Sequence, residues 1–145
     1  MNLPRLKPRA DVAYFGTFGY EWDPLQLIAQ EKAEMRKQIV FMKTYRQLIS
    51  QGTFYRLQNP FSHNEASWMV VSRDRKEALV GYYAILCQVN GPYTRVRLTG
   101  LDLDVRYLVN DESIYYGDEL MHYGLITDHH ENGDFTSQLF VLKAL

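Results

Sequence analysis

The chain has 145 residues, enough for one ordinary domain, or for a small domain plus part of a second. Apolar residues make up 46% and charged residues 23%, a balance typical of globular proteins. The formal net charge of -1 provides no basic footprint, which argues against a nucleic-acid partner. Aromatic residues reach 14%, with 11 tyrosines among them, and this favours β-strands.

The single cysteine, Cys87, lies in the apolar run from Ala78 to Val89. It has no partner for an internal disulfide, so we expect a buried, inert thiol and no oxidising compartment. The first apolar run, residues 12–15, is too short for the core of a signal peptide, and no segment approaches the roughly 20 apolar residues that span a bilayer. We therefore expect a cytoplasmic protein without a membrane partner.

Residues 12–15, Val-Ala-Tyr-Phe, form a continuous apolar run. Such a run predicts a strand covered on both faces, as in a parallel sheet, and Gly16 and Gly19 then mark a loop. A lone buried strand followed by a helix is an unusual beginning for a self-contained domain. We expect it to be the end of a larger one.

A long amphipathic helix is predicted between Asp23, which can cap its start, and Gly52, a suitable stop. Pro24 fits the first turn, because its missing N–H would be unpaired there. At a rise of 1.5 Å per residue this helix is about 40 Å long. Its predicted apolar face carries Leu25, Ile28, Met35, Ile39, Met42, Tyr45 and Ile49, and its predicted wet face carries Glu31, Lys32, Glu34, Lys37 and Gln38.

After Gly52 the pattern changes to about seven or eight short strands separated by turn residues, with no helix between them. Alternation is clearest from Leu101 to Val109. A hairpin is predicted to join Ala66–Ser72 to Glu77–Val89 across residues 73–76. Such a pattern predicts an antiparallel β-sandwich. The remaining predicted strands are 54–57, 93–99, 113–116, 119–123 and 135–142.

Histidines give the only local cluster of metal-ligand residues, in Asp128-His-His-Glu131. Adjacent side chains point apart, whereas metal ligands must converge on one point. We therefore expect a solvated turn there and no metal site. His63 and His122 lack companion ligands and receive the same interpretation.

Several stretches resemble one known family in the same order along the chain. The first, Phe15-Gly-Thr-Phe-Gly-Tyr-Glu-Trp-Asp23, resembles the last strand and helix of the catalytic barrel in α-galactosidases of glycoside hydrolase family 36. Trp22 and Leu103 depart from the family pattern, where Leu and Pro are common. The other matching pieces are Gly52-Thr-Phe-Tyr-Arg-Leu57 with Asn59-Pro-Phe61, Trp68-Met-Val-Val-Ser72, Leu98-Thr-Gly-Leu-Asp102, and Gly117-Asp-Glu-Leu-Met121 with Gly124-Leu125.

The resemblance implies a fold that is mainly β. Residues 1–52 would be the last strand and long helix of a (β/α)8 barrel, and residues 53–145 a C-terminal antiparallel β-sandwich domain. The implied parent is a bacterial α-galactosidase, a retaining glycosidase that releases terminal α-linked galactose from oligosaccharides such as melibiose and raffinose without a cofactor. The rest of the catalytic barrel and further copies of the enzyme, in a homo-oligomer, are the other expected partners.

The family's two catalytic aspartates sit on earlier barrel strands, in motifs without a counterpart here. The resemblance therefore assigns no catalytic, cofactor-binding or metal residue to this chain, and we expect the chain alone to be inactive. Only the final loop of the barrel, residues 16–22, is present, and active-site loops lie at that end of a barrel. Thr17, Phe18 and Tyr20 are accordingly expected at the rim of the active site.

Retaining glycoside hydrolysis needs two carboxyl groups about 5 to 5.5 Å apart. We expect ordinary structural roles for the local acidic pairs, as surface, turn or capping residues. These pairs are Asp102 with Asp104, Asp118 with Glu119, and Glu21 with Asp23.

An alternative function is a stand-alone β-sandwich carbohydrate-binding module that uses a tyrosine-rich face. The competing interpretation of the same rings is core and cross-strand packing. The opening strand and helix favour the α-galactosidase, because a binding module has no use for them. The aromatic residues concerned are Trp68, Tyr82, Tyr83, Tyr93, Tyr115 and Tyr116.

Overall fold

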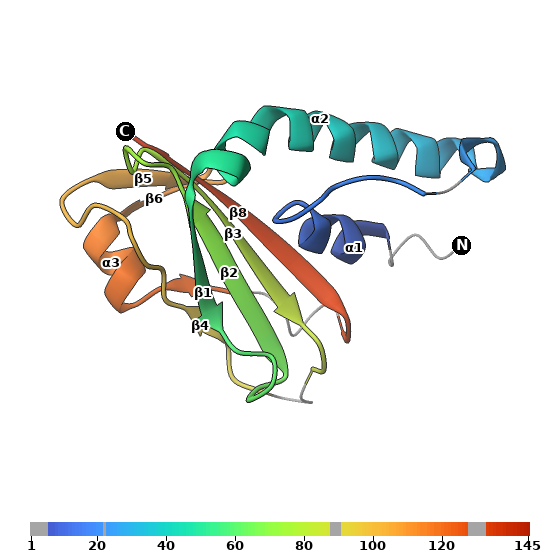
Figure 1. Ribbon diagram of the computed structural model, residues 1–145. Coiled ribbons are helices and arrows are strands. Elements are labelled where there is room, and N and C mark those ends of the chain that lie inside the picture. Colours follow the sequence, from blue (N-terminus) through green and yellow to red (C-terminus); the bar gives the residue numbers. More distant parts are fainter. Residues whose placement is uncertain (1–5, 22, 88–90, 128–132) are drawn as a thin grey trace.

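The computed structural model describes residues 6–21, 23–87, 91–127 and 133–145. Its centre is a six-stranded antiparallel sheet with the strand order β1-β2-β3-β8-β5-β6 (Figure 1). The strands are β1 (Thr53–Gln58), β2 (Glu65–Val71), β3 (Glu77–Ala84), β5 (Arg106–Val109), β6 (Ser113–Tyr116) and β8 (Thr136–Ala144), and a separate pair joins β4 (Arg95–Val96) to β7 (Leu125–Ile126). The helices are α1 (Leu6–Ala13), η2 (Pro24–Gln26, a 3-10 turn), α2 (Ala29–Gln51) and α3 (Gly117–His122).

The expected fold class, mainly antiparallel β, is confirmed. The predicted hairpin is present, because β2 and β3 pair across residues 73–76 with Val71 opposite Ala78. The last strand, β8, lies inside the sheet, where it pairs with both β3 and β5. The sheet is therefore complete only when the end of the chain joins it.

The larger core lies between one face of this sheet and a second layer made of β4, β7 and α3. Tyr107 in this core is fully buried. Its hydroxyl donates to the main-chain oxygen of Arg75 at 2.7 Å and accepts from the amide of Asp102 at 3.0 Å. The other core residues include Met69, Val80, Tyr82 and Leu142 from the sheet and Val96, Leu98, Leu101, Leu120 and Leu125 from the second layer.

The opposite face of the sheet carries α1 and the C-terminal part of α2 (Figure 1). Leu48 of α2 packs with Val70 and Leu79 of the sheet in a smaller core. In Figure 1 the N-terminal part of α2 extends beyond the sheet, above α1. None of the described helices is long and apolar enough to cross a membrane.

Residues 12–15 were predicted to be a buried strand, and that prediction is wrong for this structure. Val12 and Ala13 end helix α1, and the amide of Tyr14 donates to Ala10 at 2.9 Å in the following turn. The burial pattern explains the difference, because Leu6, Ala10 and Tyr14 are buried at a spacing of four while Val12 is 46% exposed. The helical period begins at Leu6, before the apolar run that suggested a strand.

Three other predicted strands also differ. Of residues 93–99 only Arg95–Val96 is a strand. Residues 119–123 lie in helix α3, apart from Tyr123 at its end. Of the run from Leu101 to Val109 only β5 is a strand. The Asp102 side chain accepts from the amide of Asp104 at 3.2 Å, and this local turn replaces the expected extended backbone.

The predicted long helix is divided near its start. Asp23 caps the 3-10 turn η2 through a 2.9 Å bond from the amide of Leu25, and α2 begins only at Ala29. Its end is as predicted, since the amide of Gly52 donates to Leu48 at 2.8 Å. The predicted faces are partly wrong: Leu25 and Ile28 are exposed, whereas Glu31 and Gln38 are buried.

Candidate functional site

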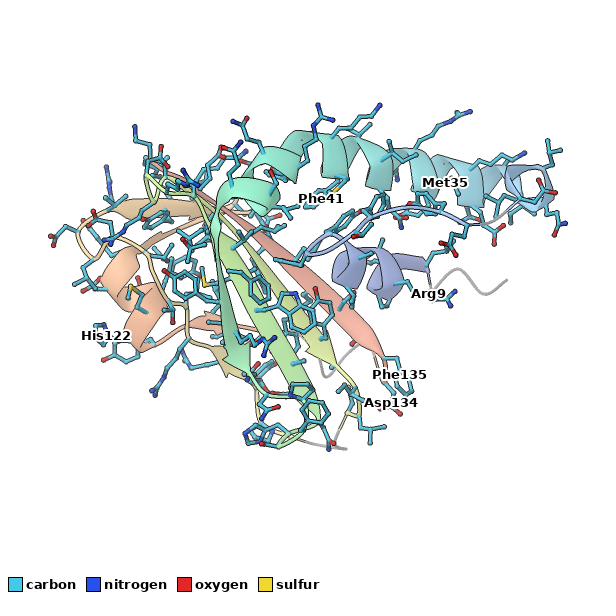
Figure 2. All side chains as sticks on the ribbon, viewed as in Figure 1. Arg9, Met35, Phe41, His122, Asp134 and Phe135 are labelled. Atoms are coloured by element: carbon cyan, nitrogen blue, oxygen red, sulfur yellow. The ribbon has the colours of Figure 1, made fainter. Side chains whose placement is uncertain are left out.

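The three residues expected at an active-site rim, Thr17, Phe18 and Tyr20, line one cavity of about 420 Å³. The cavity lies between α1, the irregular segment 16–21 and α2. Arg9, Ala10 and Ala13 contribute the α1 wall, and α2 contributes one residue, Gln38. Arg9 is labelled at the outer side of α1 in Figure 2.

Aromatic stacking holds the segment 16–21 beneath α2. The ring of Tyr14 stacks on Phe18, with 5.0 Å between centroids, and contacts Phe41 of α2 at 4.7 Å. Phe18 meets Tyr20 edge to face at 5.3 Å. Phe41 is labelled on the underside of α2 in Figure 2. Phe18 and Tyr20 are thus fixed in place by ring packing, although no regular secondary structure includes them.

Two buried polar groups on α2 are the residues that sequence reasoning missed. Gln38 is 5% exposed, and its Oε1 accepts a short hydrogen bond from the hydroxyl of Tyr20. Glu31, seven residues earlier on the same face, is 4% exposed, and its Oε2 accepts from the amide of Ile28 at 3.2 Å. Their position in the apolar period, between Ile28, Met35 and Met42, was the available signal.

Within the described part of the chain, Gln38 Nε2 and Glu31 Oε1 have no hydrogen-bond partner. Burying a polar group without a partner costs free energy. These two buried atoms are therefore a cost that the described packing of α2 does not offset.

The tyrosines of this region are suited to hydrogen bonding and not to acid-base chemistry near neutral pH. Burial, with a smaller effect of the Asp11 carboxylate, raises the pKa of Tyr14 well above its usual range. Burial also raises the pKa of Tyr20, with a smaller effect of Glu34. Both phenols remain protonated at neutral pH.

One residue of each local acidic pair accepts a main-chain hydrogen bond in a turn or a cap. Asp102 closes a turn onto the amide of Asp104, and Asp118 accepts from the amide of Glu119 at 2.7 Å in the first turn of α3. Asp23 caps η2. These hydrogen bonds hold the carboxylates in turns and a cap. They do not bring the two carboxyl groups of a pair together at a cavity.

The two described histidines, His63 and His122, lie on different elements. His122 bonds through Nδ1 to the main-chain oxygen of Asp118 at 2.8 Å, and His63 is exposed on the β1–β2 connection. The pair His129-His130 lies outside the described residues. Among the described residues, no group of three or more His, Cys, Asp and Glu side chains has metal-binding geometry.

The aromatic residues considered as a sugar-stacking platform do not share one face. Tyr82 and Tyr83 are neighbours on β3 and point to opposite sides of the sheet, with exposures of 1% and 7%. Trp68 packs on Tyr83 at 4.5 Å. Only Tyr93 and Tyr116 are exposed, at 70% and 53%, and they come from different segments. Core and cross-strand packing accounts for the buried rings.

Two family models match the chain. Residues 65–142 match the model described as the glycosyl hydrolase family 36 C-terminal domain, and residues 3–52 match the melibiase model. The melibiase match covers the helices α1 and α2, and the family 36 match covers the sheet from β2 into β8.

Relatives with curated functions are α-galactosidases. The chain is 46% identical over 144 residues to alpha-galactosidase AgaA of Geobacillus stearothermophilus, and this alignment covers 99% of the chain and 20% of that enzyme. It is 37% identical to alpha-galactosidase Mel36A of Lactobacillus acidophilus, covering 94% of the chain and 19% of the relative. The chain thus spans about one fifth of the length of the relatives it matches.

Solved structures show the same relationship. A crystal structure of the Geobacillus enzyme in complex with raffinose matches 97% of the chain with a TM-score of 0.92 at 45% identity. Its complex with stachyose matches equally, with a TM-score of 0.92 at 46% identity. In both cases the match covers 19% of the solved chain.

Proposed function

Because the chain belongs to glycosyl hydrolase family 36, we propose that it is the C-terminal part of an α-galactosidase that removes terminal α-linked galactose from oligosaccharides such as raffinose and melibiose. The observation that carries this proposal is the match to AgaA over 99% of the chain at 46% identity. The solved relatives that bind raffinose and stachyose support the substrate class.

We assign the chain to two parts of the parent enzyme. Residues 1–52 complete the catalytic barrel, and residues 53–145 form a C-terminal β domain. The separate matches at 3–52 and 65–142 support this division. The first match also disfavours a stand-alone carbohydrate-binding module, because it extends the family resemblance through the short helix α1 and the long helix α2.

The role of this chain in the parent is structural. Retaining hydrolysis requires two carboxyl groups about 5 to 5.5 Å apart, and the acidic pairs of this chain are engaged in turns and caps. The catalytic carboxylates therefore come from the remaining part of the parent. In this proposal the chain packs against the rest of the barrel and supplies the barrel's last segment.

Residues Thr17, Phe18 and Tyr20 lie at the rim of the parent's active site in this proposal. Their shared cavity, and the ring packing that fixes Phe18 and Tyr20, support the assignment.

We further propose a homo-oligomeric cytoplasmic enzyme without a cofactor. Exposed apolar residues near and on α2, Leu25 at 86% and Val40 at 63%, support additional protein contacts there. The low cysteine content, one residue in 145, supports a reducing compartment.

A chimera tests the proposal. The segment of the Geobacillus enzyme that aligns with this chain is deleted in one protein and replaced by this chain in another, and raffinose hydrolysis is measured. We expect activity in the chimera and none in the deletion protein. A soluble, folded chimera without activity contradicts the proposal, and so does α-galactoside turnover by the 145-residue chain alone.

A further inference from the structure

A second cavity, of about 840 Å³, lies at the end of the sheet that points away from α2. Its walls are the connection between β1 and β2, residues 59–64, and four described residues after β3, which are Leu86, Gly91, Pro92 and Thr94. Its described lining is Leu57, Gln58, Asn59, Pro60, Phe61, Ser62, His63, Asn64, Glu65, Leu86, Gly91, Pro92 and Thr94.

The β1–β2 connection holds one aromatic ring in solvent. Phe61 is 96% exposed, a degree of exposure that is costly for an apolar ring without a partner. Asn59 fixes the loop: its Oδ1 accepts from the amide of Phe61 at 3.0 Å, and its Nδ2 donates to the hydroxyl of Ser62 at 3.3 Å. The main-chain oxygen of Asn59 also accepts from the amide of Ser62 at 3.2 Å. The ring is therefore presented by an ordered turn.

The floor of the cavity is polar and internally bonded. Glu65 accepts from the hydroxyl of Thr94 at 2.6 Å through Oε1 and from the side-chain Nε2 of Gln58 at 3.4 Å through Oε2. Gln58 in turn accepts from the hydroxyl of Ser67 at 2.8 Å. This network ties the carboxylate to its neighbours, so the negative charge is held within the wall.

The charges around the cavity exclude a strongly ionic ligand. Among its described lining residues there is no lysine or arginine for an anion, and the carboxylate of Glu65 is already engaged. What the lining offers is amide, hydroxyl and imidazole groups beside one flat apolar ring. That combination suits a neutral molecule which has many hydroxyl groups and an apolar ring face.

We propose that this cavity binds a neutral oligosaccharide, with one pyranose ring stacked on Phe61 and its hydroxyls bonded to the side chains of Asn64 and His63. The main-chain oxygen of Asn64 accepts from the amide of Ile85 at 2.8 Å. This bond holds Asn64 next to the C-terminal end of β3. The β domain is thus a sugar-binding surface. The proposal requires no hydrolysis, so its failure leaves the α-galactosidase assignment untouched.

The test is a titration of the 145-residue chain with stachyose, followed by amide chemical shifts. We expect shift changes confined to residues 57–65 and 91–94, with a dissociation constant in the range of about 1 to 10 mM. The variants Phe61→Ala and Asn64→Ala are expected to weaken binding about tenfold. Both side chains lie on the surface, so circular dichroism should show an unchanged fold.

Tyr123→Ala is the matched control, because Tyr123 is 69% exposed and lines a different cavity. It is expected to bind stachyose as the unmodified chain does. The absence of any shift change, or equal binding by Phe61→Ala, overturns the proposal. If Phe61→Ala instead abolishes concentration-dependent self-association in sedimentation and stachyose has no effect, the ring is a contact between copies and the proposal is wrong.

Discussion

The carboxylate of Asp11 on helix α1 accepts a hydrogen bond from the hydroxyl of Ser137 on strand β8, with 2.6 Å between Oδ2 and Oγ. Lys7 Nζ lies 2.6 Å from the same oxygen, and Asp11 is only 4% exposed. The hydroxyl of Tyr83 on β3 donates to the main-chain oxygen of Asp11 at 2.7 Å. The first described helix is therefore anchored to the middle of the sheet by residues 72 and 126 positions away.

Replacing Asp11 with asparagine is expected to lower the free energy of unfolding by about 1 to 3 kcal/mol, because a buried charged acceptor with two donors is lost. Urea unfolding measures this change. Asp104→Asn is the control, since Asp104 is exposed, and it should stay within about 0.5 kcal/mol of the unmodified chain. A change equally small for Asp11→Asn would show that this contact does not anchor α1.

Hydrogen exchange is expected to be faster before Gly52 than in β2, β3 and β8. The three strands are paired on both sides, whereas α2 contacts the sheet mainly through its end near Leu48. Within α2, amides of residues 29–37 should exchange before those of residues 46–51. Protection of α2 that rises with protein concentration would indicate self-association through the helix. A dilute monomer whose helices are protected as well as its strands would contradict this prediction and indicate a complete domain.

Gly124→Ala is expected to destabilise the fold by more than about 2 kcal/mol. Gly124 has φ of +84°, and a Cβ there would lie 2.4 Å from the main-chain oxygen of Val96. Gly133→Ala separates the two causes, because Gly133 has φ of +74° and no atom of the described residues lies within 4 Å of such a Cβ. The free energy of unfolding of this variant should fall only by the cost of a positive φ in alanine, about 1 kcal/mol. Equal losses in the two variants, measured by thermal unfolding, would show that the clash is relieved by movement of β4.

Stability is expected to fall as the pH rises above 10, the region where an exposed tyrosine ionises. Burial, with a smaller effect of Asp11, raises the pKa of Tyr83 above that value, so the folded state holds the proton more tightly than the unfolded chain does. The stabilisation is complete below the unfolded pKa and is lost as the pH rises through and beyond it. Burial raises the pKa of Tyr14 and Tyr82 in the same direction.

Unfolding free energies between about pH 8 and pH 11 measure this dependence. Tyr83→Phe is the control, because it removes the ionising group and keeps the ring. The variant should have a shallower decline above pH 10, in addition to a constant loss from the missing bond to Asp11. An identical slope in the two proteins would rule out Tyr83 as a source of the alkaline sensitivity.

Elements defined by neighbouring residues were predictable from the sequence. The hairpin between β2 and β3 follows from two apolar runs around Arg73-Asp-Arg-Lys76, and the end of α2 follows from Gly52. The capping role of Asp23 at the start of the helical region was also predicted from the sequence. Each of these features depends on contacts within a few residues.

The errors occurred where a distant part of the chain decides the local structure. Residues 12–15 are apolar enough for a buried strand, but the sheet places Leu6, Ala10 and Tyr14 in its packing and so favours a helix. Glu31 and Gln38 look like exposed helix residues, yet the segment with Phe18 and Tyr20 folds beneath α2 and covers that face. Such burial cannot be predicted from a short stretch of sequence, because it depends on a distant segment.

The sequence by itself determined the family, through its resemblance to known α-galactosidases along the chain, and the predominance of antiparallel strands, through residue types at short spacing. Only the tertiary structure decided that β8 enters the middle of the sheet, that Asp11 joins Ser137, and that Thr17, Phe18 and Tyr20 share one cavity. The physical reason is that local propensities differ by about 1 kcal/mol or less per residue, whereas burial of one large side chain contributes about 1.5 to 3 kcal/mol. Long-range packing therefore overrides local preference wherever the two disagree.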